Sequence, residues 1–371
     1  MSSKSPSAET IAKKVLVLNV ASAFGGAEKS ISILIEALKK DRGIESEDTL
    51  ALVYEHKRLS ELNGIQLYRF ETGSLRRIRN WFSLRRKLRT LTKVVQDFAP
   101  DLIISNTYRS HLLLLLIRRQ IGHAKLFVWV RDFQQPGIRW IAGFIRPQAV
   151  LVPSKAVLET YKFNVPVLVY QPLEMDLPSV NQAASEQDAD ESLNIVLLAN
   201  LARWKGVEYA IHAAGELSKS PLRCKLDVYG NVADENYLDE LKQLVQGDLQ
   251  DVVTFHEFAN VDEIFDGADV VFVTSVSRHG GPETYSRVVV EAFSRKIPVI
   301  AFSCGGPKYL IRDGENGFLV PEGDWKMLAL RCQELAADKE LRIEMGENAK
   351  SSYLRLAAES DKTFQRLFRD V

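Results

Sequence analysis

Two glutamates, Glu283 and Glu291, stand eight positions apart in a segment between the apolar runs 270–275 and 298–303. A Gly-Pro turn precedes Glu283, which places this residue in a loop or in the first turn of a helix. The sequence VVVEAF predicts a buried helix, with Glu291 about two turns inside it. Because a carboxylate on an apolar helix is costly to bury without hydrogen-bond donors, the pair can hold polar groups of a ligand. The simpler alternative is that Glu283 caps the helix and Glu291 is exposed.

A cationic turn lies between the apolar run 194–201 and the amphipathic sequence VEYAIHAAGEL, and it contains Arg203 and Lys205. A lysine beside a helix N-terminus is unfavourable by ~0.3–1 kcal/mol unless an anion balances it. Lys and Arg bind phosphate through charge-assisted hydrogen bonds, so such a ligand would not require a metal ion. The turn therefore favours a phosphate ligand over an exposed surface lysine.

Glycine turns follow several of the apolar runs. Gly25 and Gly26 come after the run 15–20 and open a helix, where backbone amides and the helix dipole can approach an anion. The spacing is not GxGxxG, so a plain turn from strand to helix explains these glycines equally well.

His279 stands in another such turn, and the six histidines show no metal-ligand spacing. The sequence therefore predicts no metal site.

The elements that must position these residues alternate along the chain between short aliphatic runs and amphipathic stretches, which predicts βαβ units and parallel sheets. The predicted strands are residues 15–20, 49–54, 65–70, 101–106, 125–130, 149–154, 165–170, 194–201, 225–231, 252–258, 270–275, 298–303 and 317–321. The predicted parts are a disordered tail at 1–12, an N-terminal domain at 13–175, a polar linker at 176–192 and a C-terminal domain at 193–351. The remaining residues, about 352–371, have a helical pattern.

Composition excludes several classes of protein. The chain has 48 Lys plus Arg and 48 Asp plus Glu, so no overall field attracts nucleic acid, and we expect no nucleic-acid partner. The three cysteines are far apart and without ligand spacing, which indicates a reducing compartment. No segment reaches the ~18 uninterrupted apolar residues of a membrane span. We therefore expect a cytoplasmic protein.

A basic segment at residues 76–93 complicates that expectation. It belongs to the sequence LRRIRNWFSLRRKLRTLTKVV, in which apolar residues recur at helical spacing. The simpler interpretation is a helix that covers a sheet and turns a basic face to solvent. The alternative is peripheral contact with an anionic membrane or a lipid-phosphate acceptor.

Taken together, these segments resemble the retaining GT-B glycosyltransferases of family 4. The resemblance covers nearly the whole chain, through FGGAEKS, PDLIISN, VLVPSKAV, the Lys-Gly turn and above all the E-x7-E block ETYSRVVVEAFSRKIPVIAFSCGGPKYLIRDGENGFLVPEGD. It implies an α/β protein of two doubly wound Rossmann-like domains facing a central cleft, with the C-terminal helix packing back on the N-terminal domain. The implied donor substrate is a nucleotide-diphosphate sugar, UDP- or GDP-linked, and no cofactor is implied.

The functional positions of the family carry over residue by residue. The resemblance implies that Lys205 holds the diphosphate, that Glu283 contacts the donor sugar and that Glu291 contacts the ribose, with Lys205 and Glu283 as the catalytic residues. The other residues implied at the donor are Gly25, Gly26, Asn200, Arg203, Tyr285, Ser286 and Arg287. Those expected near the acceptor or the sugar are Arg131, Asp132, Arg109 and His279.

The expected function is retaining, metal-independent transfer of a sugar to a glycan, a lipid-linked acceptor or a small molecule. Four places depart from the family pattern. Asn200 stands where an arginine is common, Arg131 where many members have a histidine, Gln171-Pro172 where Asn-Gly is frequent, and Tyr309 where a glutamate is usual. Two alternatives stay open, a GT-B sugar-nucleotide epimerase and a non-catalytic partner subunit that binds a nucleotide sugar.

Overall fold

The computed structural model describes residues 14–21, 25–42, 49–70, 81–173, 192–221 and 223–369. The chain forms two compact units: unit 1 comprises Met1–Glu174 and Ala358–Val371, and unit 2 comprises Met175–Ala357. The predicted tail at 1–12 and nearly all of the predicted linker lie outside the described residues. Each unit is built around one parallel sheet, as the alternation of aliphatic and amphipathic segments predicted.

Unit 1 contains a seven-stranded parallel sheet in the order β3-β2-β1-β4-β5-β6-β7. Strand order runs outward in both directions from the β1–β4 neighbours, so the sheet is doubly wound. The strands are β1 (Val15–Asn19), β2 (Leu50–Tyr54), β3 (Gln66–Arg69), β4 (Leu102–Ser105), β5 (Lys125–Trp129), β6 (Ala149–Val152) and β7 (Val167–Val169). The helices are α1 (Gly26–Arg42), η1 (Lys57–Glu61), α2 (Trp81–Phe98), α3 (Tyr108–Ile117), η3 (Arg118–Gln120), α4 (Ile138–Ile145) and α5 (Lys155–Thr160).

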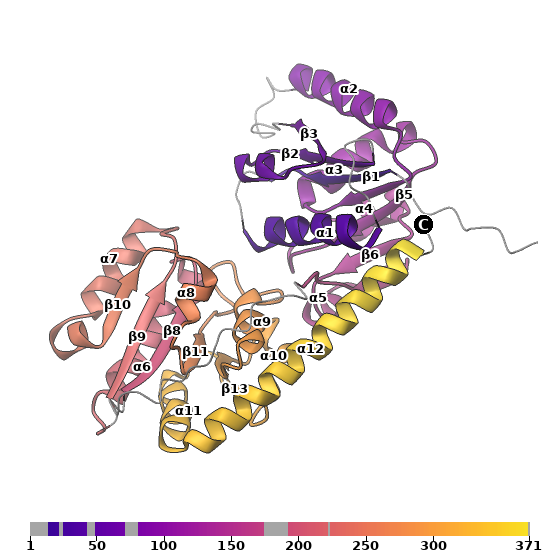
Figure 1. Ribbon diagram of the computed structural model, residues 1–371. Helices are drawn as coiled ribbons and strands as arrows, with labels where there is room; N and C mark the ends of the chain where they lie inside the picture. Colours follow the sequence, from indigo (N-terminus) through magenta and orange to yellow (C-terminus); the bar gives the residue numbers. More distant parts are fainter. Residues whose placement is uncertain are drawn as a thin grey trace, which may run out of the picture. The chain divides into compact units, whose positions relative to one another are not determined.

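Helices cover both faces of this sheet. In Figure 1, α1 lies in front of the strands of unit 1, and α3 and α4 lie behind them. The core behind the sheet joins α2, α3 and α4 through buried residues such as Leu91, Leu113 and Ile141. The core in front joins α1 to the last turns of the chain through Phe364 and Leu367. Both faces are therefore apolar, which explains why the strands are nearly continuous aliphatic runs.

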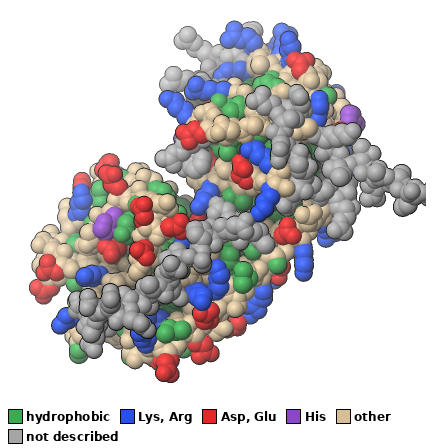
Figure 2. Space-filling view, viewed as in Figure 1, with side chains coloured by type: hydrophobic (Ala, Val, Ile, Leu, Met, Phe, Trp, Pro, Cys, Tyr) green, Lys and Arg blue, Asp and Glu red, His purple; other side chains and the backbone are tan. Residues whose placement is uncertain are grey.

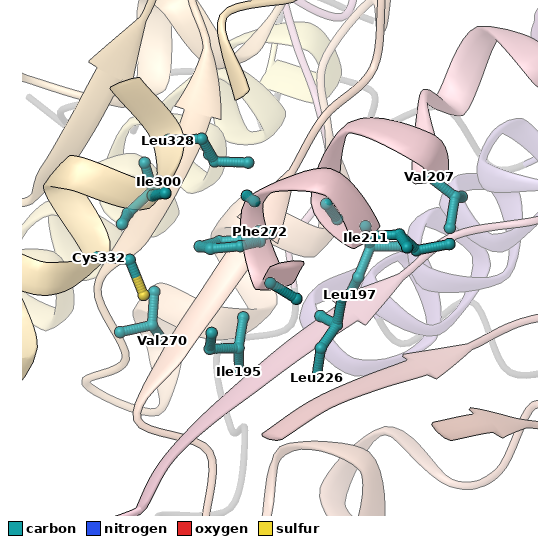
Figure 3. Packing of buried hydrophobic residues seen from close by; sticks show 14 of the residues in the cluster. Ile195, Leu197, Val207, Ile211, Leu226, Val270, Phe272, Ile300, Leu328 and Cys332 are labelled. Atoms are coloured by element: carbon teal, nitrogen blue, oxygen red, sulfur yellow. The ribbon is translucent and has the colours of Figure 1, made fainter. Parts of the chain in front are cut away.

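Unit 2 contains a six-stranded parallel sheet in the order β10-β9-β8-β11-β12-β13. The strands are β8 (Ser192–Leu198), β9 (Arg223–Tyr229), β10 (Val253–His256), β11 (Val270–Val273), β12 (Val299–Phe302) and β13 (Gly317–Val320). The helices are η4 (Arg203–Lys205), α6 (Val207–Leu217), α7 (Glu235–Leu244), η5 (Gly247–Asp251), α8 (Val261–Phe265), α9 (Arg287–Ser294), α10 (Pro307–Leu310), α11 (Trp325–Ala337) and α12 (Lys339–Arg369). Figure 3 shows Phe272 of β11 packed among aliphatic side chains of this core, including Ile195 and Ile211.

The helix α12 contributes to both units, because residues up to Ala357 are counted with unit 2 and those from Ala358 with unit 1. Among the helices that the structure describes, none is both long enough and apolar enough to cross a bilayer.

Candidate functional site

A pocket in unit 2 opens at the carboxyl ends of β8 and β11. Its polar lining consists of Lys205, Thr274, Ser275, Glu283 and Ser286. Apolar residues of the two strands also line the pocket. The neighbours β8 and β11 are the strands from which the chain winds outward in opposite directions. Ligands of doubly wound sheets bind at such a point, because the loops that follow the two strands diverge there and leave a crevice.

An ion pair occupies the centre of this pocket. The ammonium of Lys205 contacts Oε1 of Glu283, and Oγ of Ser275 donates to the same oxygen at 3.4 Å. The side chains of Lys205 and Glu283 are only 13% and 16% exposed. Nζ of Lys205 also lies 4.1 Å from the ring centroid of Trp204. Glu283 thus supplies the anion that balances a lysine near the N-terminus of α6.

The turn that carries Lys205 is fixed to the end of β11 by two hydrogen bonds. Oγ1 of Thr274 donates to the carbonyl of Lys205 at 3.0 Å, and the amide of Val276 donates to the carbonyl of Trp204 at 2.8 Å. Gly206 follows with a φ of 62°, a left-handed conformation that lets the chain enter α6 directly. The backbone of the turn is therefore held against the residues that follow β11.

The glycine pair Gly305-Gly306 supports the Glu283 loop. The amide of Gly306 donates to the carbonyl of Glu283 at 2.7 Å. Nearby, Sγ of Cys304 lies 3.0 Å from the carbonyl oxygen of Ser275, and burial raises the pKa of this thiol to about 12. The thiol is therefore protonated at neutral pH and is not an activated nucleophile.

The N-terminus of α9 carries buried polar atoms that lack a hydrogen-bond partner. Ser286 is the N-cap, with a φ of 65°. Its Oγ is buried without a partner, as are Nε and Nη1 of Arg287. Nε of Arg287 lies 3.7 Å from a carboxylate oxygen of Glu291. Because helix N-termini attract anions, these groups suit a negatively charged ligand.

The structure corrects two expectations for the glutamates. Glu283 does not cap α9, because Ser286 occupies that position. Glu291 is the fifth residue of α9, little more than one turn inside, and only 7% of it is exposed. The simpler interpretation, a capping Glu283 and an exposed Glu291, is therefore wrong.

Other residues expected at the donor lie outside the lining of this pocket. Arg203 binds both carboxylate oxygens of Glu240 on α7, at 2.7 and 2.6 Å, and these bonds raise its pKa. Asn200 is exposed, and Tyr285 is buried in the loop before α9. His279, which was expected near the acceptor or the sugar, is also exposed. Arg203 therefore serves a structural ion pair and does not share the pocket with Lys205.

In unit 1, Gly25 belongs to a buried polar network. Its amide donates to Oε2 of Glu28 at 2.9 Å, and the amide group of Asn19 donates to the other carboxylate oxygen at 3.5 Å. Asn106 in turn donates to Asn19 at 2.6 Å. Burial raises the pKa of Glu28. The amide expected to approach a phosphate is thus already bound to a carboxylate, while Gly26 begins α1.

Arg131 closes the same network. Its Nε donates to Asn106 at 2.8 Å, its Nη1 donates to Gln171 at 2.9 Å, and its guanidinium stacks 3.4 Å from the ring centroid of Trp129. Only 7% of Arg131 is exposed. The side chain therefore ties together the ends of β4, β5 and β7.

The remaining acceptor candidates are separate from this network. Asp132 is exposed, and Arg109 pairs with Glu55 at 3.2 Å. Ser275 and Asn106 were not among the predicted site residues. Each stands at the carboxyl end of a predicted strand, and that position was the signal that could have indicated them. Among the described residues, no three His, Cys, Asp or Glu side chains are placed to hold a metal ion.

Comparison with known proteins relates these features to a family. Residues 181–352 match the family model described as Glycosyl transferases group 1. An uncharacterized glycosyltransferase of Haemophilus influenzae is 24% identical over 284 residues, which cover 73% of this chain and 76% of that protein. The capsular polysaccharide biosynthesis glycosyltransferase CapM of Staphylococcus aureus is 26% identical over 161 residues, covering 43% of this chain and 41% of CapM.

Solved structures extend the likeness to the whole chain. HepE of Anabaena in complex with UDP aligns with a TM-score of 0.77 at 20% identity, covering 95% of this chain and 99% of HepE. HepE has also been solved in complex with UDP-glucose. The two Rossmann-like units thus form the GT-B fold of glycosyltransferases. The match to the group 1 glycosyltransferases covers most of unit 2, which contains the pocket.

Proposed function

We propose that the unit 2 pocket binds a UDP- or GDP-sugar and that the protein is a retaining, metal-independent glycosyltransferase. The observation that carries this proposal is the Lys205–Glu283 ion pair, which lies beside the N-terminus of α9 where the winding of the sheet reverses. The family match of this unit supports it, as do the HepE structures in complex with UDP and UDP-glucose.

Each group has a definite task in the proposed reaction. The diphosphate binds the ammonium of Lys205 and the amides and hydroxyl at the start of α9, in place of the internal ion pair. The carboxylate of Glu283, released from Lys205, accepts hydrogen bonds from hydroxyls of the donor sugar. Glu291 lies about one turn beyond the start of α9, where the diphosphate binds, and it binds the ribose.

During transfer, the bond from the anomeric carbon to the diphosphate oxygen breaks, and the bond to the acceptor oxygen forms on the same face. The acceptor proton passes to the departing phosphate oxygen. Negative charge develops on the diphosphate, where Lys205 and the α9 amides stabilise it in a preorganised arrangement. Glu283 stabilises the electron-poor sugar without becoming its nucleophile. The acceptor is a glycan, a lipid-linked molecule or a small molecule.

Glu283→Gln tests this assignment, because it keeps the size of the side chain and removes the charge. We expect the wild-type protein to hydrolyse its donor slowly and to gain thermal stability with UDP or GDP. The variant should release nucleotide from the donor about 100-fold more slowly than wild type, or slower still. Its affinity for the nucleotide should stay within a few-fold of the wild-type value. Glu240→Gln, a matched change outside the pocket, should leave both unchanged.

Two results would overturn the proposal. Retained turnover in Glu283→Gln would remove this residue from catalysis. Nucleotide binding by the wild-type protein with no release from any UDP- or GDP-sugar, with or without simple acceptors, would indicate a non-catalytic binding subunit.

A further inference from the structure

The outward side of α4 in unit 1 carries large apolar side chains. Trp140 is 74% exposed and Phe144, one turn later, is 68% exposed, while Leu116 on the neighbouring helix α3 is 55% exposed. The opposite side of α4 is already buried in the core through Ile141 and Ile145. The fold therefore does not need Trp140 or Phe144 for its own packing, and clustered exposed aromatics mark an interaction surface.

The helix α4 and the neighbouring η3 also bear exposed cations, and acidic residues are scarce in the sequence around them. The sequence contains no Asp or Glu in residues 107–125 or 133–153. Nε of Arg118 donates to the carbonyl of Ile145 at 2.8 Å, which holds η3 against the end of α4. The exposed cations of η3, of α4 and of the α4 C-cap are Arg119, Arg139 and Arg146, respectively.

The helix α2 adds further positive charge on the same face of the sheet. Arg85, Arg86 and Arg89 are exposed, whereas Leu91 and Val95 pack into the core. Figure 2 shows Lys and Arg side chains gathered over the end of unit 1 that carries α2. The acidic side chains on the helices of this face are Asp97, at the end of α2, and Glu159, on α5. Because the whole chain has equal numbers of acidic and basic residues, this face is a local asymmetry.

We propose that α4 is a docking element for an anionic lipid bilayer. Trp140 and Phe144 enter the boundary between headgroups and acyl chains, and the cations of η3, α4 and α2 contact lipid phosphates. A bilayer surface offers an anionic layer directly above an apolar one, which matches this arrangement. Membrane contact by the basic segment 76–93 was the alternative interpretation of the sequence, beside a helix that covers the sheet and turns a basic face to solvent. The described part of that segment supplies charge, but its apolar residues Leu88 and Leu91 face the core, so α4 provides the inserting side chains.

Vesicle co-sedimentation of the full chain tests the proposal. The wild-type protein should bind vesicles of phosphatidylcholine with about one third phosphatidylglycerol, and it should not bind phosphatidylcholine alone. The double variant Trp140→Ser, Phe144→Ser should lower the binding about tenfold or more. The matched control Phe258→Ser, Leu330→Ser, which changes residues 50% and 47% exposed in unit 2, should bind like wild type.

Charge and insertion can be separated. Arg85→Gln, Arg86→Gln and Arg89→Gln should each lower affinity about fivefold and should reduce its salt dependence. Tryptophan emission should shift to the blue on vesicle binding, and Trp140→Phe should bind while losing most of that shift. The thermal shift with UDP should be unchanged in Trp140→Ser, Phe144→Ser, which shows that the variant is folded and that its pocket is independent of docking.

Three results would overturn the proposal: no vesicle binding by the wild-type protein, equal binding by Trp140→Ser, Phe144→Ser, or a dimer in solution that this variant dissociates. The last result would identify the face as a contact between copies of the chain.

Discussion

The backbone of Gly306 lies directly against that of Tyr285, two residues beyond Glu283. A Cβ atom placed on Gly306 would lie 2.6 Å from Cα and 2.7 Å from N and C of Tyr285. At the same point the Gly306 amide donates to the carbonyl of Glu283 at 2.7 Å. The position of the candidate catalytic carboxylate therefore depends on the absence of a side chain on another loop.

Gly306→Ala should destabilise unit 2 and impair the pocket. The added methyl group must push the 283–286 loop away, because the obstructing atoms are backbone atoms. We expect a loss of about 2–3 kcal/mol in the free energy of unfolding and a larger proportional loss of donor turnover. Urea unfolding and nucleotide release measure the two effects. Gly215→Ala on α6, whose Cβ would meet only Leu249 at 3.6 Å, should be neutral or stabilising. Equal effects of the two substitutions would contradict the steric argument.

Lys205→Met should weaken nucleotide binding and also the fold. The largely buried carboxylate of Glu283 loses its cation, which we expect to cost about 1–3 kcal/mol of stability at neutral pH. The double variant Lys205→Met, Glu283→Gln should regain most of that stability while remaining inactive. Calorimetric titration with UDP and urea unfolding of the four proteins form a double-mutant cycle. Additive stability changes would show that the pair is not coupled. Lys219→Met, at a lysine that is 72% exposed, is the matched control.

Ser286→Ala should separate stability from binding. Because the hydroxyl is buried without a partner, its removal should leave the free energy of unfolding unchanged or raise it by up to about 1 kcal/mol. The same change should weaken UDP binding roughly tenfold, since a hydrogen bond to a charged phosphate is lost. Thermal unfolding with and without UDP tests both effects. Unchanged affinity would remove Ser286 from the diphosphate site.

His111 should make unit 1 sensitive to acid. Its ring is fully buried and Nδ1 lies 2.7 Å from Oγ of Ser105, and burial lowers its pKa from 6.5 to about 3. As the pH falls, His111 is therefore protonated in the unfolded state before it is protonated in the folded state. The stabilising contribution is complete above pH 6.5 and is lost as the pH falls toward 3, by up to ~1.4 kcal/mol per pH unit.

His111→Asn should remove this part of the pH dependence of urea unfolding, because asparagine does not titrate. His123→Asn, at a histidine that is 81% exposed, should keep the wild-type slope between pH 7.5 and 5. Identical slopes for wild type and His111→Asn would refute the assignment to His111.

Much of the fold could be predicted from the sequence because both sheets are covered on both faces. Strands such as Val15–Asn19 and Val270–Val273 are continuous aliphatic runs, and each stands where one was predicted. The predicted runs often extended beyond the strand, as at Thr274 and Ser275. These two residues leave β11 and line the pocket, so the residues beyond the strand are the functional ones.

The site was less predictable, because it depends on side-chain direction. Arg203 and Lys205 lie two positions apart in a 3-10 turn, where two steps rotate the chain by about 240°, so they point to different surroundings. Only Lys205 reaches Glu283, 78 residues away in sequence.

The Gly25–Glu28 bond could have been predicted from local spacing, since a glutamate at the third helical position often accepts a hydrogen bond from the amide of the residue before the helix.

The shared helix α12 has a practical consequence for exchanging parts between related proteins. A fragment ending at Glu174 would lack Phe364 and Leu367, which fill the core beneath α1 although they come from the other end of the chain. A chimaera that takes its first 174 residues from a relative must therefore also take that relative's last 14 residues. A single crossover after residue 174 would pair the sheet of unit 1 with the C-terminal end of α12 from the other parent.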